Sequence, residues 1–482
     1  MARRSVVVVG GGVAGLAAAY ELSEARASPD PTTPRIELIE LSERLGGPLA
    51  TIEFAGRVLD VGPDGVLARR PEALELIDEL GLRDRLEPIA ASGAWIWLRE
   101  AARELPPGLT LGVPTDAAAL RRWKGLSRRA RWALARDRRW PARLSVGEDA
   151  TVGEIVRAKL GDEIARALVE PLIGGIQAGR IDELSARSVF PDLFEAARRG
   201  GSLVAALGEG GPASPGPHHA TVSGGPAFVS LTTGIGSLVG ALEGALVARG
   251  VVLRRATAVT ALRRTPSGPY PWEVDTATTT TPADAVVLAT PAPVTAALGG
   301  RHAPALAGLS RVRSAGVAVV SLSLERATTT LPATGTGLLV PLATAWPGPD
   351  TMLVTALTFL DRKWPHLRRD DDVLVRAHVG RSDDARWRDL DDDALVARVV
   401  DEARHLLGRV GVVRAAHVAR WPAALAQYEI GHASLVEAAR TGAHALGLAL
   451  AGSAYDGVGV PATIGSGRRA AREVRVHLAH QR

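Results

Sequence analysis

Buried strands and helices alternate in the first part of the chain. Four consecutive valines, Val6–Val9, run into three glycines, which is typical of a buried parallel strand followed by a tight turn. The pattern then predicts a helix over Gly15–Ser23, a loop over the Pro- and Thr-rich stretch 28–34, and a second buried strand over Ile36–Ile39. The order strand, helix, strand predicts a βαβ unit at this end of the chain.

The middle of the chain has a different pattern, and the βαβ pattern returns after it. From Pro71 onward apolar residues recur at helical spacing, and a Gly-, Pro- and Ser-rich break spans 208–225. Beyond the break the pattern predicts, in order, a helix over 237–249, strands over 251–261 and 285–289, alternating strands over 315–379, a helix over 391–407, a strand over 447–451, a glycine turn and a final helix.

Nucleotide-type glycine turns therefore occur near both ends of the chain. The simplest arrangement is an α/β fold with a discontinuous Rossmann-like nucleotide-binding domain, into which the other parts are inserted. We predict that this domain comprises residues 1–70, 223–300 and 415–482. Residues 71–222 form a mainly helical subdomain, and residues 301–414 form a substrate-binding domain of mixed sheet and helices.

The first glycine turn carries a dinucleotide-binding motif. Gly10, Gly12 and Gly15 form G-x-G-x-x-G directly after a predicted strand and at the start of a predicted helix. The first glycine permits the turn, the second lets the backbone approach a pyrophosphate, and the third lets helix and strand pack closely. The motif alone is weak, but Glu40 ends the second strand, where a carboxylate can accept both ribose hydroxyls.

Residues 40–47, with the sequence ELSERLGG, narrow the choice of cofactor. They resemble the second signature of FAD enzymes of the glutathione-reductase-like superfamily, and are much less typical of NAD dehydrogenases. The resemblance implies that Gly46 and Gly47 let the chain pass close to the cofactor, with Leu41 and Arg44 beside it. A strand then leads into another tight turn, formed by Gly62, Pro63, Asp64 and Gly65.

The C-terminal glycine turn completes the predicted cofactor site. A strand ending at Ala451 is followed by a turn rich in glycine and then by a helix. Backbone amides there could face the flavin, and the positive end of the helix dipole would favour electron density on it. The turn residues expected to contact FAD are Gly452, Val458, Gly459 and Val460.

Composition excludes several kinds of chemistry. The chain has no Cys, so it has no disulfide, catalytic thiol or thiolate metal site, and its 11 His show no metal-ligand spacing. We therefore predict no metal and, from the missing Cys, a cytoplasmic location. The basic, apolar start of the chain ends in a glycine turn and has no signal-peptide cleavage site. The chain has no uninterrupted apolar run of about 18 residues, so we predict no membrane-spanning helix.

The net charge of +5 is unevenly distributed, because residues 121–143 combine many arginines with three tryptophans. This segment is either a solvated helix with apolar anchors or a surface for an anionic substrate, an acidic partner or lipid headgroups. Nucleic acid is not an expected partner, since no recognised binding module accompanies the arginines. Membrane contact is expected to be peripheral at most.

Several blocks along almost the whole chain resemble the oxygen-dependent porphyrinogen oxidases, and within them the bacterial coproporphyrinogen III oxidases. The order and spacing of the blocks carry the resemblance: residues 49–73, 111–114, 151–179, 184–191, 363–366, 375–381, 420–432 and 456–461. It implies FAD-dependent oxidation of coproporphyrinogen III to coproporphyrin III by O2, with release of H2O2, in haem biosynthesis. The flavin carries this chemistry, so no catalytic side chain is implied.

The resemblance also implies roles for individual residues. By position in the family, the residues that should contact FAD include Val13, Ala14, Leu16, Gly62, Pro63, Asp64, Gly65, Val259 and Trp421. Arg70 occupies a position where the family has a basic residue facing the substrate. The chain departs from the family pattern at Pro48, Val66, Gln177 and Ala426, where Lys, Phe, Tyr and Pro are usual. These departures concern the substrate pocket more than the cofactor site.

Other functions fit the same motifs. Protoporphyrinogen IX oxidase performs the same chemistry on a more apolar substrate with two propionates. A flavin amine oxidase or carotenoid desaturase shares the cofactor motifs but should lack the blocks at 363–366 and 427–432. The alternative that is not an enzyme is a non-catalytic FAD-binding protein. The expected partners are the tetrapyrrole substrate, O2 and, transiently, a downstream iron-inserting enzyme.

Overall fold

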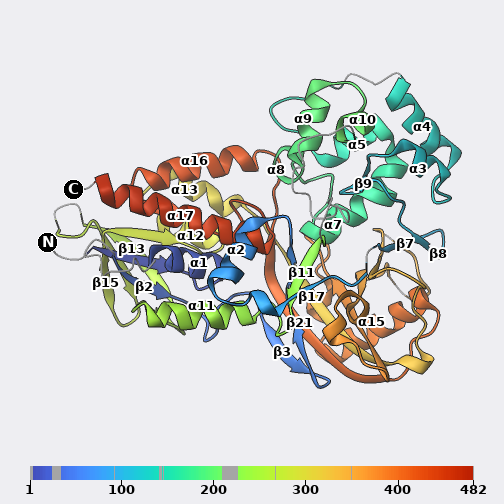
Figure 1. Ribbon diagram of the computed structural model, residues 1–482. Coiled ribbons are helices and arrows are strands. Elements are labelled where there is room, and N and C mark those ends of the chain that lie inside the picture. Colours follow the sequence, from blue (N-terminus) through green and yellow to red (C-terminus); the bar gives the residue numbers. More distant parts are fainter. Residues whose placement is uncertain are drawn as a thin grey trace.

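The computed structural model describes residues 4–23, 34–91, 93–139, 144, 146–208, 226–265, 268–342, 344–348 and 350–480. The molecule is elongated (Figure 1), with a parallel sheet and its helices in one half, and a second sheet and a group of helices in the other. The predicted loop at 28–34 and the break at 208–225 lie outside the described residues, except for Pro34 and Gly208.

A five-stranded parallel sheet forms the centre of the first half. Its strands come from three distant parts of the chain, in the order β12 (Val252–Arg254), β2 (Arg35–Ile39), β1 (Ser5–Val9), β16 (Ala285–Leu288) and β22 (Leu448–Leu450). The valines of β1 are buried on both faces, because Val6 and Val8 belong to one core and Val7 and Val9 to another. The predicted α/β fold with a discontinuous Rossmann-like domain is confirmed.

Two layers cover the faces of this sheet. One consists of helices α1 (Val13–Leu22), α2 (Pro71–Glu79), α11 (Ser237–Ala248) and α17 (Val460–His480). The other contains the antiparallel strands β13 (Val259–Arg264), β14 (Trp272–Thr276) and β15 (Thr280–Ala283), with helices α12 (Ala292–Gly299), α13 (Pro304–Ala307) and α16 (His432–His444). A Cβ atom on Gly467 of α17 would lie 2.1 Å from the carbonyl oxygen of Ala14, so α1 and α17 are in close contact.

A seven-stranded sheet lies in the second half. Its order is β21 (Val413–Ala426), β17 (Ser314–Glu325), β20 (Asp372–Val379), β19 (Val354–Phe359), β18 (Gly337–Leu339), β7 (Trp95–Leu98) and β8 (Ala101–Glu104). Neighbouring strands are antiparallel, except that β18 and β7 are parallel. Helix α15 (Asp392–Leu407) packs on one face of the sheet. The other face holds the polar residues of β20 and packs against the hairpin of β3 (Thr51–Phe54) and β4 (Arg57–Asp60).

A group of helices with its own apolar core completes the second half. It comprises α3 (Ala117–Arg122), α4 (Arg128–Arg139), α5 (Val152–Leu160), α6 (Asp162–Ile164), α7 (Glu170–Gln177), α8 (Ala186–Val189), α9 (Pro191–Arg199) and α10 (Leu203–Gly208). Helix α5 begins at a capping box, in which Thr151 and Glu154 each bond the other's backbone amide. In the arginine-rich segment, whose residues 140–143 lie outside the described part of the chain, residues 121 and 122 end α3 and residues 128–139 form α4. Trp132 on α4 is 62% exposed.

Short strands link these parts: β5 (Val66–Leu67), β6 (Leu86–Pro88) and β11 (Phe228–Leu231) form one small sheet, and β9 (Leu109–Thr110) and β10 (Val113–Pro114) form another. The proposed domain boundaries stay a prediction. The pairing adds that β7 and β8, from the segment 71–222, extend the seven-stranded sheet. Helix α2, from the same segment, packs in the core of the parallel-sheet half. No helix among the described residues is long and apolar enough to cross a membrane.

Candidate functional site

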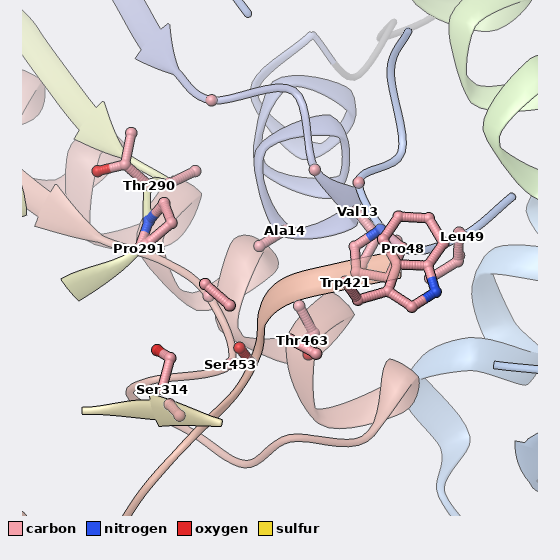
Figure 2. Close-up of a pocket in the computed structure, with 18 of the residues that line it drawn as sticks. Val13, Ala14, Pro48, Leu49, Thr290, Pro291, Ser314, Trp421, Ser453 and Thr463 are labelled. Atoms are coloured by element: carbon pink, nitrogen blue, oxygen red, sulfur yellow. The ribbon is translucent and has the colours of Figure 1, made fainter. Parts of the chain in front are cut away.

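A cavity of about 730 Å3 opens where the parallel sheet meets the seven-stranded sheet. One wall consists of the segments that follow β1, β2 and β16, so the cavity lies beyond the carboxyl ends of the parallel strands, the usual ligand position in such sheets. Figure 2 shows Val13, Pro291, Trp421 and Ser453 around it, each from a different part of the chain. The volume falls within the range of about 300–1,000 Å3 that is usual for cofactor and ligand sites.

The three motif glycines have distinct structural roles at this wall. Gly10 has a left-handed φ of +104°, and a Cβ atom there would lie 2.5 Å from the carbonyl oxygen of Ala289. A Cβ atom on Gly15 would lie 1.9 Å from the carbonyl oxygen of Gly10, so only glycine allows α1 to pack on the turn. At Gly12 a Cβ atom would meet nothing within 4 Å, because this residue borders the cavity. The backbone is therefore open to a ligand at Gly12 and closed by packing at Gly15.

Glu40 follows the neighbouring strand β2, and its carboxylate is held against the glycine turn. Its Oε2 accepts the N–H of Gly11 at 2.6 Å, and its Oε1 accepts the N–H and the hydroxyl of Ser42, the N–H at 2.8 Å. A carboxylate has about four acceptor positions, so it can still accept a bond from a ligand. Glu40 lines the cavity, in the place where the sequence predicts a ribose.

The segment that contains the second signature is fixed against the first turn. The N–H of Gly46 donates to the carbonyl oxygen of Gly11 at 2.8 Å. Arg44 donates to the carbonyl oxygens of Leu45 and Leu49, both at 3.0 Å, and to that of Gly47. Arg44 does not line the cavity, and these bonds show that it stabilises the loop from outside the site.

The C-terminal turn is stabilised from behind by charged and aromatic residues. The N–H of Gly452 donates to Ser466 Oγ at 3.0 Å, and Ser466 donates to Asp456. Burial raises the pKa of Asp456, but Arg469, Ser466 and Arg440 outweigh it and hold this pKa below its usual value. The turn therefore keeps its shape through a partly buried ionic network.

An aromatic pair supports the same turn. The rings of Tyr428 and His432 stack at 4.2 Å, Tyr428 donates to the carbonyl oxygen of Ser453, and His432 Nε2 donates to that of Ala454 at 2.9 Å. Both residues belong to the block at 427–432, which sequence analysis identified only through its resemblance to a known family.

Most of the predicted cofactor residues line this one cavity: Gly10, Gly12, Val13, Ala14, Glu40, Leu41, Gly46, Gly47, Gly62, Pro63, Asp64, Val259, Trp421, Gly452, Val458 and Val460. The others that were predicted do not line it: Gly15, Leu16, Arg44, Gly65 and Gly459. Gly65 packs against Trp364 and β11, and the carbonyl oxygen of Gly459 accepts the N–H of Thr463 in the first turn of α17. Contact of each with FAD stays a prediction.

Arg70, the predicted substrate-binding residue, precedes α2 and does not line the cavity. Its Nη2 and Nε donate to Glu72 at 2.9 and 3.2 Å. Its neighbour Arg69 has two buried nitrogens, Nε and Nη2, without a hydrogen-bond partner among the described residues. Burial, and then Arg70, lower the pKa of Arg69.

The wall formed by the seven-stranded sheet holds residues that sequence reasoning missed. Arg376 and His378 of β20 line the cavity beside Asp64. Asp64 accepts Lys363 Nζ at 2.9 Å and Trp364 Nε1 at 3.0 Å, and Arg376 Nη1 lies 3.7 Å away. Burial raises the pKa of Asp64, but the cations and these bonds dominate and hold it far below its usual value. The available signal was the pattern DVLVRAHV, in which Asp372, Arg376 and His378 share one face of an otherwise apolar strand.

These features fit a dinucleotide cofactor. The cavity is lined by residues from near both ends of the chain, its lining is mainly apolar, and it offers an anchored carboxylate at Glu40. Neither α1 nor its cap residue Gly12 supplies a side-chain cap, so the first amides of the helix remain available to phosphates. In the part of the chain that the structure describes, no three His, Asp or Glu side chains are grouped to hold a metal.

Helix α7 brings Ile176 to the cavity and carries a buried acid at its start. Glu170 Oε2 accepts the N–H of Ile181 at 3.1 Å, and Oε1 has no hydrogen-bond partner among the described residues. Burial, the largest influence, raises the pKa of Glu170 from 4.5 to about 7. The folded protein thus binds this proton more tightly than the unfolded chain does.

We predict that Glu170 lowers stability as the pH rises. The stabilisation that protonated Glu170 gives the folded state is fully present below pH 4.5 and is lost as the pH rises to about 7. The free energy of unfolding falls by on the order of 3 kcal/mol over this range. The variant Glu170→Gln stays neutral and should escape this loss. Melting curves from about pH 5 to about pH 8 test this, and parallel pH dependence of Tm in the two proteins would contradict it.

Comparison with known proteins places the chain among flavoproteins. Residues 13–475 match the family described as flavin containing amine oxidoreductase. The coproporphyrinogen III oxidase of Mycobacterium tuberculosis is 34% identical over 98% of each chain, and the human protoporphyrinogen oxidase is 33% identical over 98% of each. A crystal structure described as a candidate protoporphyrinogen oxidase from Exiguobacterium sp. 255-15 has 30% identity, a TM-score of 0.83 and 99% coverage of both chains.

Proposed function

Because the chain belongs to the flavin containing amine oxidoreductase family, we propose that it oxidises coproporphyrinogen III to coproporphyrin III with O2 and releases H2O2. It is an FAD-dependent oxidoreductase of porphyrin biosynthesis. The observation that carries the proposal is the position of one cavity between the cofactor-binding turns and the seven-stranded sheet. A bulky tetrapyrrole needs a second wall opposite the cofactor, and Val317 and Val319 of the sheet make this wall apolar together with Ile176 of α7.

Bound FAD supplies the redox chemistry, because it accepts a hydride from the substrate and passes the electrons to O2. The chain's own residues bind and orient the reactants. Glu40 would accept the ribose hydroxyls, and the amides at the starts of α1 and α17 would hold the phosphates and the flavin end. The apolar wall keeps water from the reacting carbon, and Trp421 is fixed there by its bond to the carbonyl oxygen of Val61 at 3.0 Å.

The choice between coproporphyrinogen and protoporphyrinogen rests on charge. The two named relatives are nearly equally similar to this chain, at 34% and 33% identity, so identity does not separate them. Coproporphyrinogen has four propionates and protoporphyrinogen has two. The chain's net charge is +5, and Arg69 has buried nitrogens without a hydrogen-bond partner among the described residues. A net positive charge favours association with the more anionic substrate.

We predict a higher kcat/KM for coproporphyrinogen III than for protoporphyrinogen IX. Exposed ion pairs contribute about 0.2–1 kcal/mol each, so the preference should be graded and should shrink as salt rises. Porphyrin fluorescence in air, with both substrates over a range of salt, measures it. Equal rates, or preference for protoporphyrinogen without detergent, would favour the protoporphyrinogen alternative and leave the FAD site in place.

The partners follow from the same proposal. The tetrapyrrole and O2 are the reactants, and transient contact with a downstream iron-inserting enzyme stays a prediction, as does the cytoplasmic location. Bleaching of the flavin by coproporphyrinogen without O2 would support an enzyme over a non-catalytic FAD-binding protein. A flavin amine oxidase or desaturase would leave the porphyrinogen unoxidised.

A further inference from the structure

His378 occupies a place on the cavity wall that the proposed reaction has not yet used. It lies on β20 with Val319 of β17 opposite on one side and Ala356 of β19 on the other. Its neighbour along the same face, Arg376, belongs to the same wall. The strand therefore presents an imidazole on the cavity wall between the charged Arg376 and Asp64 and the apolar side chains of Val317 and Val319.

One nitrogen of the His378 ring is engaged and the other is free. Nε2 lies 3.2 Å from the hydroxyl of Thr358 on β19. Among the residues that the structure describes, Nδ1 has no hydrogen-bond partner. When Nε2 carries the proton and donates it to Thr358, the lone pair of Nδ1 is available to a ligand.

The groups around His378 keep it uncharged. Burial lowers its pKa to about 4, and Arg376 on the same strand and Lys363 on α14 (Leu360–Lys363) add to this effect, while Asp64 opposes it. The facing strands contribute only the uncharged Val319, Ala356 and Thr358. At neutral pH the ring is therefore an acceptor without charge, and it is too weak a base to keep a proton.

The other ionisable side chains of the wall already have hydrogen-bond partners. Arg376 donates to the carbonyl oxygens of Asp60 and Gly62, the latter at 3.3 Å. Asp64 is bonded by Lys363 and Trp364. Glu40 is anchored by Gly11 and Ser42 at the nucleotide end.

We propose that His378 is a substrate-contacting residue whose Nδ1 accepts a hydrogen bond from a pyrrole N–H of the porphyrinogen. The proposal rests on the proposed function. The pyrrole N–H groups are the polar part of the macrocycle that enters an apolar site, and an unpaired buried donor is costly. The bond orients the ring, and the proton lost on oxidation goes to solvent.

The test compares His378→Leu, which removes the acceptor, with His378→Gln, whose amide oxygen can replace it. In holoenzyme, His378→Leu should raise KM for coproporphyrinogen III about 10-fold, and His378→Gln should recover most of that loss. Absorbance of the bound flavin and FAD affinity should stay unchanged in both. The dependence of kcat/KM on pH from about 6 to about 9 should keep its shape, since His378 does not titrate there.

His417→Leu is the matched control, because His417 lies on β21 of the same sheet and does not line the cavity. Should His378→Leu fail to fold, Thr358→Val removes the Nε2 partner instead and should raise KM severalfold. An unchanged KM in either variant overturns the proposal, as does a shifted flavin spectrum or FAD affinity, which would place His378 on the cofactor. Unsubstituted protein that oxidises no porphyrinogen would overturn the proposed function itself.

Discussion

Gly15→Ala is expected to destabilise the nucleotide-binding half of the protein strongly, whereas Gly12→Ala should leave the fold intact and weaken FAD binding. The Cβ atom added at position 15 would lie 1.9 Å from a backbone oxygen, that of Gly10, which has no flexible side chain to move aside. Overpacking of this kind costs about 3 kcal/mol or more. At Gly12 the same methyl group meets nothing within 4 Å and extends into the cavity.

Denaturation of the two apoproteins and titration with FAD separate these effects. Gly15→Ala should lose stability before any cofactor is added. Gly12→Ala should unfold like the unsubstituted apoprotein and bind FAD at least about 10-fold more weakly, because the backbone can no longer approach the pyrophosphate. Normal stability of the apoprotein in Gly15→Ala, or normal FAD affinity in Gly12→Ala, would refute the roles assigned to these glycines.

The cofactor half was predictable because its signals are local. The spacing of Gly10, Gly12 and Gly15 after four valines specifies a strand, a turn and a helix within a few residues. Glu40 follows the next strand, and parallel pairing of β1 and β2 brings it beside the turn. The same logic applies to the C-terminal turn, where β22 pairs with β16 and delivers Gly452 to the same edge.

The wall opposite the cofactor turns was not predictable in the same way. Arg376 and His378 face the cavity only because β20 pairs with β17 and β19 in one register, and a shift of one residue would turn both away. The partner of Asp64 is Lys363, 299 residues further along the chain. The pairing of β7 with β18 likewise joins segments that no local pattern connects. Such contacts depend on how the strands of the whole sheet pair with one another.

This long-range wall is where a single substitution should destabilise the second half most strongly. Asp64→Ala leaves the ammonium of Lys363 and the guanidinium of Arg376 without their carboxylate. Arg376 is only 2% exposed and Lys363 18%, so neither cation is freely hydrated. Breaking a buried pair in this way costs about 3–5 kcal/mol.

Denaturation of Asp64→Ala, of Lys363→Met and of the double variant measures the coupling. The double variant should recover part of the loss, because it removes one orphaned cation along with its partner. In the unsubstituted protein, the lowered pKa of Asp64 means that its stabilisation is present above the carboxyl's unfolded pKa of 3.8 and is lost as the pH falls further. Asp64→Ala should lack this acid-dependent component.

A cost below about 1 kcal/mol for Asp64→Ala would mean that water in the cavity solvates both cations. That result would in turn predict a larger cost in the FAD-bound protein. Asp64, Arg376 and His378 all border the cavity, so a bound cofactor or substrate would displace that water. Comparing the apoprotein with the holoenzyme therefore distinguishes a network buried by the fold from one that is completed by its ligand.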